Sequence, residues 1–236
     1  MNAAILVAAG KGARMGASVD KLFLNVAGRP VVAHTWQRFE EADCIGEIIL
    51  VVQRGRLEKF EALAEKFRFQ KPFRIVLGGK ERQDSVWNGL AALSPAVEVV
   101  AIHDAARPCV SGELIQATVK CALETGAAVA AQAVTDTIKE SADGRLISRT
   151  LDRSKLWSVQ TPQTFRVEII RQAIEAARRK NLVLTDDTAA CELIGQRVQL
   201  VAGTAPNPKV TVPGDLPLVE ALLRDEQRKG ADGGGI

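Results

Sequence analysis

The sequence of 236 residues predicts an α/β protein built on a mostly parallel sheet that is flanked by helices. Short apolar runs alternate along the chain with segments whose apolar residues follow helical spacing, which is typical of βαβ units. Runs such as Ile48-Ile49-Leu50-Val51-Val52 are continuous rather than alternating, as expected for strands that are covered on both faces. In such sheets ligands bind at the carboxyl ends of the strands, so functional residues are sought there.

The individual elements follow from these patterns. Apolar runs predict strands near 3–8, 47–53, 73–77, 98–103 and 127–133. Helical spacing predicts helices near 31–42, 57–67, 84–93, 112–124, 166–180, 187–195 and 214–228. Thr185 and Asp186 are suited to cap the helix near 187–195. We expect one domain over 1–229 and a loose tail over 230–236.

The alternating pattern stops after Val134. Residues 135–150 are polar, and Asp143-Gly144 between two short runs is a hairpin signal with little apolar surface to bury. We therefore expect a projecting β-arm over about 134–153. An isolated two-stranded hairpin is marginal in water, so a second copy of the chain is the expected contact, giving a homodimer. The alternative is a surface hairpin that lies on its own domain.

Composition excludes several classes of protein. Hydrophobic residues make up 47% and charged residues 25% of the chain, and no apolar run approaches a membrane span in length. The net charge of +3 comes from interleaved charges, which disfavours nucleic acid and favours a small anionic ligand. The four cysteines are scattered, so neither a zinc site nor a disulfide framework is expected. The apolar start lacks a basic leader segment, which predicts a cytoplasmic protein.

A glycine-rich loop with two cations follows the first strand. Gly10, Gly12 and Gly16 leave backbone N–H groups open to phosphate oxygens, and Arg14 and Lys21 supply positive charge. The spacing is one residue longer than the dinucleotide fingerprint, and no Ser or Thr follows Gly10-Lys11 as an ATPase P-loop requires. The loop therefore predicts a triphosphate site of another kind. A purely structural turn is the alternative.

Two further segments carry polar groups at the same sheet edge. Asp104 follows the run ending at Ile102, where one carboxylate can hold Mg²⁺ against phosphate oxygens. Pairing with Arg107 within the turn is the alternative. Gly78 to Ser85 forms a second glycine-rich turn before a helix and could read a base or ribose, with capping by Asp84 or Ser85 as the alternative. His103 is assigned no chemistry.

Together the motifs resemble one enzyme family. They are Ala8-Ala9-Gly10-x-Gly12-x-Arg14-Met15, Lys21, Gly78-Gly79-x-Glu81-Arg82-x-x-Ser85, His103-Asp104-Ala105-Ala106-Arg107-Pro108, Asp152-Arg153-x-x-Leu156-Trp157, Gln160-Thr161-Pro162-Gln163 and Lys209-Val210-Thr211. In this order, over about residues 3 to 225, they are similar to the 2-C-methyl-D-erythritol 4-phosphate cytidylyltransferases of the non-mevalonate isoprenoid pathway. Ribitol-5-phosphate cytidylyltransferases share three of the motifs.

The resemblance implies a Rossmann-like sheet of the nucleotidyltransferase type and a reaction between CTP and a polyol phosphate, with Mg²⁺ beside Asp104. The acceptor phosphate attacks the α-phosphorus in line and pyrophosphate leaves, so catalysis consists of positioning and charge neutralisation. Residues matching the family's catalytic set are Arg14, Lys21, Arg153 and Lys209. Residues matching its nucleotide site are Ala8, Ala9, Gly10, Gly12, Gly79, Arg82, Ser85, Asp104 and Ala105. Residues matching its acceptor site are Asp104, Arg107, Thr137, Arg153, Thr161, Thr185 and Lys209.

In the family, the equivalents of Thr137 and Arg153 reach the site from the other subunit, which agrees with the arm expected from the residues. Lys80 departs from members that carry an acidic residue there. Three alternatives to the leading prediction remain: a ribitol-5-phosphate or other polyol-phosphate cytidylyltransferase, a non-catalytic nucleotide-binding protein, and an NAD-dependent oxidoreductase. The loop spacing disfavours the last.

Overall fold

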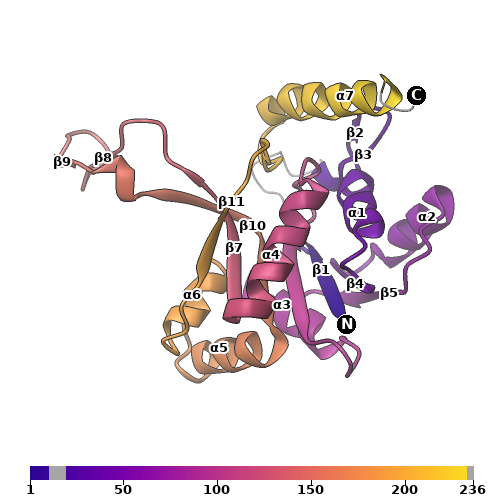
Figure 1. The fold of residues 1–236 in the computed structure, drawn as a ribbon, viewed down its shortest axis with the longest axis horizontal. Helices are drawn as coiled ribbons and strands as arrows, with labels where there is room; N and C mark the ends of the chain where they lie inside the picture. Colours follow the sequence, from indigo (N-terminus) through magenta and orange to yellow (C-terminus); the bar gives the residue numbers. More distant parts are fainter. Residues whose placement is uncertain (11–19, 233–236) are drawn as a thin grey trace.

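A seven-stranded sheet forms the centre of the protein (Figure 1). The structure is a computed structural model that describes residues 1–10 and 20–232, without the side chains of 230–232. The strand order is β11-β7-β10-β6-β1-β4-β5. Strands β1, β4, β5 and β6 pair in parallel, as do β7 and β11, whereas β10 runs antiparallel to both of its neighbours. The predicted α/β class and mostly parallel sheet are confirmed.

The five predicted strands are all present, and two further strands join them. The sheet consists of β1 (Asn2–Ala8), β4 (Glu47–Val52), β5 (Phe73–Leu77), β6 (Val99–Asp104), β7 (Ala127–Ala133), β10 (Trp157–Arg166) and β11 (Gln199–Ala202). Strands β10 and β11 were not predicted from the sequence pattern. Strand β10 is rich in polar residues and its register shifts between Val159 and Gln163, around a cis Thr161–Pro162 peptide. Its pattern therefore does not resemble that of a buried strand.

The seven predicted helices are also present, with ends that differ by a few residues. They are α1 (Val31–Glu41), α2 (Leu57–Phe67), α3 (Arg82–Ala91), α4 (Gly112–Thr125), α5 (Val167–Arg179), α6 (Asp187–Glu192) and α7 (Leu216–Asp232). Helix α7 continues past the predicted end at 228, and 233–236 lie outside the described residues. None of the helices in the described ranges is both long and apolar enough to cross a membrane.

Both faces of the sheet are buried. Along β1, Leu6 belongs to a core formed with α1, α2, α4 and α7, whereas Ile5 belongs to a core formed with α3, α5 and α6. Both side chains are fully inaccessible. The continuous apolar runs of the sequence are explained by this two-sided burial.

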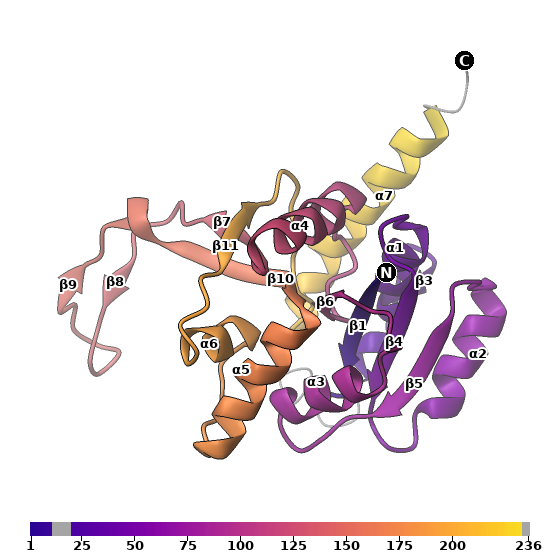
Figure 2. The same cartoon turned by 60° about the horizontal axis from the view of Figure 1, so that its bottom comes forward.

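The segment after β7 forms a hairpin that projects from the body (Figures 1 and 2). Strands β8 (Lys139–Glu140) and β9 (Arg149–Thr150) pair antiparallel, and Asp143 Oδ1 accepts the N–H groups of Arg145 and Leu146 in the turn. Leu146 and Ile147 are 74% and 65% exposed. The predicted hairpin is present and extends away from its own sheet, while its part in dimerisation stays a prediction.

Short elements connect the sheet to the helices. They are the two-stranded β2 (Asn25–Val26) and β3 (Arg29–Pro30) and the 3₁₀ turns η2 (Lys21–Phe23), η3 (Arg153–Lys155) and η4 (Pro213–Asp215). The η2 turn begins at Asp20, whose side chain accepts the N–H of Leu22. It places Lys21 beside the ends of β1 and β6.

Candidate active site

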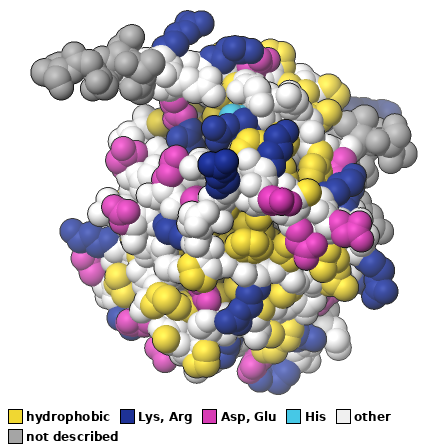
Figure 3. Space-filling model, turned by 90° about the vertical axis from the view of Figure 1, so that its right-hand side faces the viewer, with side chains coloured by type: hydrophobic (Ala, Val, Ile, Leu, Met, Phe, Trp, Pro, Cys, Tyr) yellow, Lys and Arg dark blue, Asp and Glu magenta, His cyan; other side chains and the backbone are white. Residues whose placement is uncertain are grey.

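Two cavities lie side by side at the carboxyl ends of β1 and β6. The larger, of about 450 Å³, is lined by Val7, Ala8, Ala9, Gly10, Lys21, Leu22, Gly79, Lys80, Glu81, Arg82, Ser85, Asp104, Ala106 and Lys209. The smaller, of about 180 Å³, is lined by Arg82, Asp104, Arg107, Val159, Gln160, Thr161, Gln163, Thr185, Asp186 and Lys209. Arg82, Asp104 and Lys209 line both cavities. The two spaces therefore share a charged wall. Figure 3 shows another side of the molecule, where Lys and Arg side chains gather beside a histidine that reaches the surface.

Close backbone approach shapes the larger cavity. The carbonyl of Ala9, directly after β1, accepts a hydrogen bond of 3.1 Å from Gln53 Nε2. A Cβ at Gly78 would lie 2.2 Å from the Cβ of Ala9, and a Cβ at Gly79 would lie 2.2 Å from that of Asp84. Both separations are too short for any side chain, so Gly78 allows the second turn to approach the first, and Gly79 allows the second turn to fold closely onto the start of α3.

The first turn of α3 holds the second glycine-rich segment in place. The hydroxyl of the buried Ser85 accepts the N–H of Gly79 at 3.1 Å and donates to the carbonyl of Glu81. The carboxylate of Asp84 accepts the N–H of Glu81 at 3.1 Å. The capping alternative is thus confirmed for this turn, and Ser85 lies at the wall of the cavity at the same time.

Asp104 lies at the centre of the shared wall among three cations. Its Oδ2 lies 2.7 Å from Lys209 Nζ and 3.8 Å from Arg107 Nε, and its Oδ1 lies 3.6 Å from Arg82 Nε. Burial alone would raise the pKa of Asp104, but the charges of Lys209, Arg82 and Arg107 outweigh burial and hold it below its ordinary value. The pairing with Arg107 proposed as the alternative is present, as one of three contacts.

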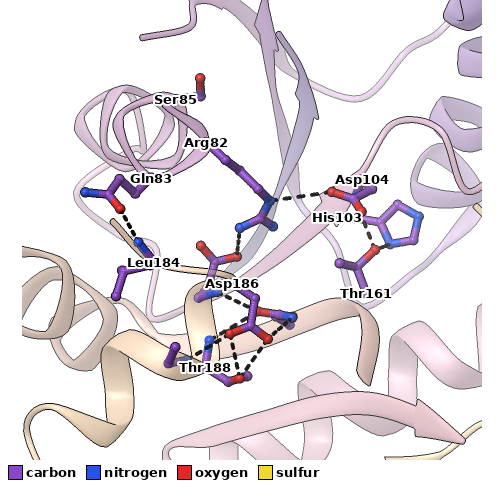
Figure 4. A network of polar contacts seen from close by, with 12 residues as sticks. Arg82, Gln83, Ser85, His103, Asp104, Thr161, Leu184, Asp186 and Thr188 are labelled. Atoms are coloured by element: carbon purple, nitrogen blue, oxygen red, sulfur yellow. Dashed lines mark hydrogen bonds and ion pairs between the residues drawn. The ribbon is translucent and has the colours of Figure 1, made fainter. Parts of the chain in front are cut away.

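Arg82 links this wall to α6. Its Nη1 lies 2.7 Å from Oδ2 of Asp187, whose side chain is 2% exposed (Figure 4). Burial would lower the pKa of Arg82, but the carboxylates of Asp187 and Asp104 outweigh burial and raise it. The guanidinium is therefore held between two carboxylates and keeps a fixed orientation at the boundary of the cavities.

The donor set at the shared wall fits Mg²⁺. This ion prefers oxygen ligands and is bound through one or two carboxylates together with substrate phosphates and waters. Asp104 offers an ionised carboxylate to both cavities. In residues 1–10 and 20–232 there is no group of three or more His, Cys, Asp or Glu that could hold a metal. A magnesium ion here would thus depend on Asp104 and on oxygens that the ligand brings.

The predicted catalytic cations are only in part within the described residues. Lys21 lines the larger cavity, and its Nζ donates to the carbonyl of Val210 at 2.8 Å. Asp20, which caps its 3₁₀ turn, lies 3.0 Å from Arg56 Nη1. Arg14 and Gly12 were predicted at this site, and both lie outside the described residues.

Thr161 connects the smaller cavity to the end of β6. Its hydroxyl accepts the N–H of Asp104 at 3.1 Å and lies 3.0 Å from Nδ1 of His103. The other ring nitrogen of His103 lies 3.2 Å from the carbonyl of Arg107. Burial lowers the pKa of His103 to about 3, so the ring is neutral. His103 is thus a buried histidine with partners for both ring nitrogens, in line with assigning it no chemistry.

Arg107 lines the smaller cavity, and the buried Asn207 links it to Thr161. Arg107 Nη1 donates to the carbonyl of Asn207 at 2.6 Å, and the buried amide of Asn207 donates to the carbonyl of Thr161 at 2.8 Å. Thr185, which also lines this cavity, is an exposed residue directly before the α6 cap. Asp186 caps α6 by accepting the N–H of Ala189, as predicted.

Three predicted site residues lie outside both cavities. Ala105 is fully buried, with its N–H on the carbonyl of Val7 and its own carbonyl bonded by Thr35. Thr137 and Arg153 are exposed at the base of the arm, and the Arg153 guanidinium donates to the carbonyl of Thr135. Within one chain, the fold therefore does not bring these three side chains to the site.

Two buried polar residues that connect the elements of the site, Gln163 and Asp187, were not predicted from the sequence pattern. Gln163 is 3% exposed, and its side-chain oxygen accepts the N–H groups of Asp187 and Thr188, while its amide group donates to Asp186. Gln163 belongs to the motif Gln160-Thr161-Pro162-Gln163, but no role was predicted for its side chain. Asp187 gave no signal of its own, because its position beside Asp186 resembles ordinary acidic residues in a first helical turn.

The arrangement defines a class of enzyme. A sheet edge with a glycine-lined cavity, a second polar cavity and a shared wall of one carboxylate and two cations is that of an α/β nucleotidyltransferase, in which a nucleotide and an acceptor lie side by side.

Comparisons with known proteins name the family. The family model of 2-C-methyl-D-erythritol 4-phosphate cytidylyltransferase matches residues 2–225. The protein of this name from Alkaliphilus oremlandii is 45% identical over 221 residues, covering 93% of this chain and 94% of the relative. That from Pelotomaculum thermopropionicum is 43% identical over 234 residues, covering 99% and 98%. This chain belongs to the 2-C-methyl-D-erythritol 4-phosphate cytidylyltransferase family.

Solved structures with the same family names have a similar fold. The 4-diphosphocytidyl-2C-methyl-D-erythritol synthase of Anaerococcus prevotii has a TM-score of 0.84 at 30% identity, covering 95% of this chain and 96% of that one. The 2-C-methyl-D-erythritol 4-phosphate cytidylyltransferase of Thermus thermophilus has a TM-score of 0.76 at 33% identity, covering 95% and 100%. The resemblance noted in the sequence is confirmed, and with it the prediction of an enzyme of the nucleotidyltransferase class.

Proposed function

We propose that this chain transfers CMP from CTP to 2-C-methyl-D-erythritol 4-phosphate, giving 4-diphosphocytidyl-2-C-methyl-D-erythritol and pyrophosphate. The observation that carries the proposal is the wall of Arg82, Asp104 and Lys209, which belongs to both cavities. A nucleotide in the larger cavity and a phosphate in the smaller one would meet at this wall. Two phosphates repel each other, so the cations there are what allows them to approach.

The larger cavity is assigned to CTP. Ala8, Ala9, Gly79 and Ser85 line the part that we assign to the base, where open backbone groups can read polar edges. Gly10 lines this cavity, and we assign it, together with the glycine-rich sequence at 11–19 that lies outside the described residues, to the triphosphate. The smaller cavity, with Arg107, Thr161 and Thr185, is assigned to the acceptor.

The chemical step needs no general base. An oxygen of the acceptor phosphate, already an anion, attacks the α-phosphorus of CTP, and a new oxygen–phosphorus bond forms. The bond between the α-phosphorus and the bridging oxygen of the β-phosphate breaks, and pyrophosphate leaves with that electron pair. Because no proton has to be removed from the nucleophile, the site needs positioning and charge neutralisation. Within the described part of the site, the neutral His103 is buried behind Thr161.

The cations have separate roles in this proposal. Lys21, with Arg14, stabilises the negative charge that develops on the α-phosphate, and Lys209 holds the acceptor phosphate beside it. Lys209 is suited to this because its ammonium is already fixed by Asp104. Asp104 would hold Mg²⁺, which supplies charge neutralisation for the phosphates of the nucleotide when it is bound.

We further propose a homodimer in which the arm of each chain reaches its partner. Thr137 and Arg153 lie outside both cavities of their own chain, and Leu146, Ile147 and Trp157 are exposed on the arm and at its base. Apolar side chains on a projecting hairpin need a covering surface. In the dimer, Thr137 and Arg153 would complete the acceptor site of the other subunit. Residues 1–229 would form a single cytidylyltransferase domain.

A pyrophosphate-release assay tests the proposal. Purified protein with Mg-CTP is given 2-C-methyl-D-erythritol 4-phosphate, ribitol 5-phosphate or no acceptor. The proposal expects release that depends on the first acceptor. Release with ribitol 5-phosphate alone would keep the reaction class and reject the substrate. Binding of Mg-CTP without release with either acceptor would reject catalysis.

A further inference from the structure

The side chain of Gln83 joins the nucleotide side of the site to the acceptor side. Its Nε2 donates to the carbonyl of Leu182 at 2.9 Å. Its Oε1 accepts the N–H of Leu184 at 2.8 Å, the contact drawn in Figure 4. A carboxamide that uses its donor and its acceptor on the backbone of one short segment fixes both the position and the direction of that segment. Gln83 itself lies in the first turn of α3 and lines neither cavity.

The segment that Gln83 holds leads directly to the acceptor cavity. Residues 182–184 connect α5 to the cap of α6, and the next two residues, Thr185 and Asp186, line the smaller cavity. The segment is packed only in part: Val183 is 75% exposed and Leu182 is 39% exposed, whereas Leu184 packs against the core on the α3 and α5 side of the sheet. A segment with few apolar contacts opens easily unless polar contacts fasten it. The two hydrogen bonds from Gln83 are therefore well placed to set where Thr185 stands.

The neighbouring residue strengthens this connection. Arg82, which lines both cavities, forms its buried ion pair with Asp187 just beyond the cap of α6. The same turn of α3 also carries Ser85, which holds the N–H of Gly79 in the nucleotide cavity. The first turn of α3 is thus bonded to the walls of both cavities.

We propose that Gln83 is a positioning residue for the acceptor phosphate: it fixes residues 182–184 and so keeps Thr185 at the wall of the smaller cavity, where Asp186 is already held by Gln163. The identity of the acceptor rests on the proposed function, whereas the positioning role rests on the contacts of Gln83. Loss of the amide should weaken acceptor binding and leave the nucleotide cavity intact, because Ser85 and Asp84 keep their own contacts.

The test compares Gln83→Met, which keeps the length of the side chain and removes both hydrogen bonds, with Gln37→Met. The amide of Gln37 bonds Glu41 along α1, away from both cavities. We expect Gln83→Met to raise the KM for 2-C-methyl-D-erythritol 4-phosphate about tenfold, as for the loss of two hydrogen bonds. The KM for CTP and the Tm should match those of Gln37→Met. An unchanged acceptor KM, or an equal rise in both KM values, would overturn the proposal.

Hydrogen exchange gives a readout that does not depend on turnover. In the wild-type protein the amide of Leu184 should exchange more slowly than that of Val183, which has no hydrogen-bond partner among the described residues. In Gln83→Met this protection should fall at Leu184 and persist at the amide of Ala189 in α6. Equal exchange at Leu184 in both proteins would overturn the positioning role. Absence of turnover in the wild type would reject the proposed function alone.

Discussion

The ammonium of Lys209 lies 2.7 Å from Oδ2 of Asp104, which joins the segment after β11 to the end of β6. The sequence around Lys209 has no carboxylate within four residues, and this favoured a ligand role. The fold supplies a carboxylate from a distant strand and leaves the side chain 37% exposed at the cavities. Lys209 is thus fixed and still accessible, as a residue that positions a phosphate must be.

Replacing Lys209 by Ala should lower kcat by about 100-fold or more, as for other charged groups that stabilise a transition state. The affinity for CTP should change much less, because the larger cavity keeps its glycine turns. Steady-state kinetics and direct nucleotide binding measure the two effects. Lys120→Ala, on the exposed face of α4, serves as the matched control and should behave as wild type. Equal losses in CTP affinity and kcat would contradict the assignment.

Replacing Lys21 by Ala should also depress kcat far more than nucleotide affinity. The expected loss is about 2–4 kcal/mol of transition-state stabilisation. Since Lys21 Nζ also donates to the carbonyl of Val210, the Tm of the variant must be measured alongside its kinetics. The same split is expected for Arg14. An unchanged kcat in both variants would remove the proposed mechanism.

The glycines of the second turn should not tolerate a side chain. In Gly78→Ala the new Cβ would meet Ala9 Cβ at 2.2 Å, so one of the two turns that form the nucleotide cavity must move. We expect a clear rise in KM for CTP and a loss of stability of about 1–3 kcal/mol, typical of overpacking. Gly112→Ala, where no atom lies within 4 Å of the new Cβ, is the control. Wild-type nucleotide binding by Gly78→Ala would show that the turns are not tightly apposed.

The neutral His103 predicts a pH dependence of stability. Its pKa is lowered by burial from 6.5 to about 3, so the folded protein excludes a proton that the unfolded chain binds. The free energy of unfolding is therefore not reduced by His103 above pH 6.5, and it falls as the pH is lowered from 6.5 toward 3. Between pH 7 and 5 the free energy of unfolding should fall by about 1–2 kcal/mol more in wild type than in His103→Gln. Urea unfolding at pH 7 and at pH 5 measures these free energies. Equal losses of free energy of unfolding in wild type and in His103→Gln would contradict a buried histidine with a lowered pKa.

If each active site uses residues of both subunits, mixing two inactive variants should restore activity. A chain with Lys21→Ala mixed with a chain with Arg153→Ala should regain activity, because one site of the mixed dimer then has both an intact Lys21 and an intact Arg153 from the other chain. Each variant alone should be nearly inactive. The mixture should be assayed after unfolding and refolding together, with mass spectrometry to prove subunit exchange. Mixed dimers without recovered activity would indicate sites contained within one chain.

The sequence predicted what depends on local pattern. Continuous apolar runs predicted β4 and β6 because both faces of the sheet are buried, and the glycine turns predicted the larger cavity because they allow close backbone approach. It did not predict β10, whose polar residues lie in a strand only because β6 and β7 pair with it on both sides. A strand set by its neighbours carries little signal of its own.

Ion pairs between distant segments of the chain could not be predicted from the sequence pattern either. The contacts of Arg82 with Asp187 and of Lys209 with Asp104 join segments that only the fold brings together. Family resemblance identified Arg82, Lys209 and Asp104 as site residues, but it indicated neither Asp187 nor the ion pairs between these side chains. The cytoplasmic location and the expected absence of nucleic-acid and membrane partners stay predictions from the sequence.

The most direct test of the account follows oxygen atoms through the reaction. 2-C-Methyl-D-erythritol 4-phosphate carrying ¹⁸O in its non-bridging phosphate oxygens is incubated with Mg-CTP and the enzyme, and the products are observed by ³¹P NMR. If the acceptor phosphate attacks the α-phosphorus, the signal of that phosphorus in the product shifts because the bridging oxygen is ¹⁸O, and pyrophosphate carries no label. A product with an unlabelled bridge, or labelled pyrophosphate, would contradict the proposed attack.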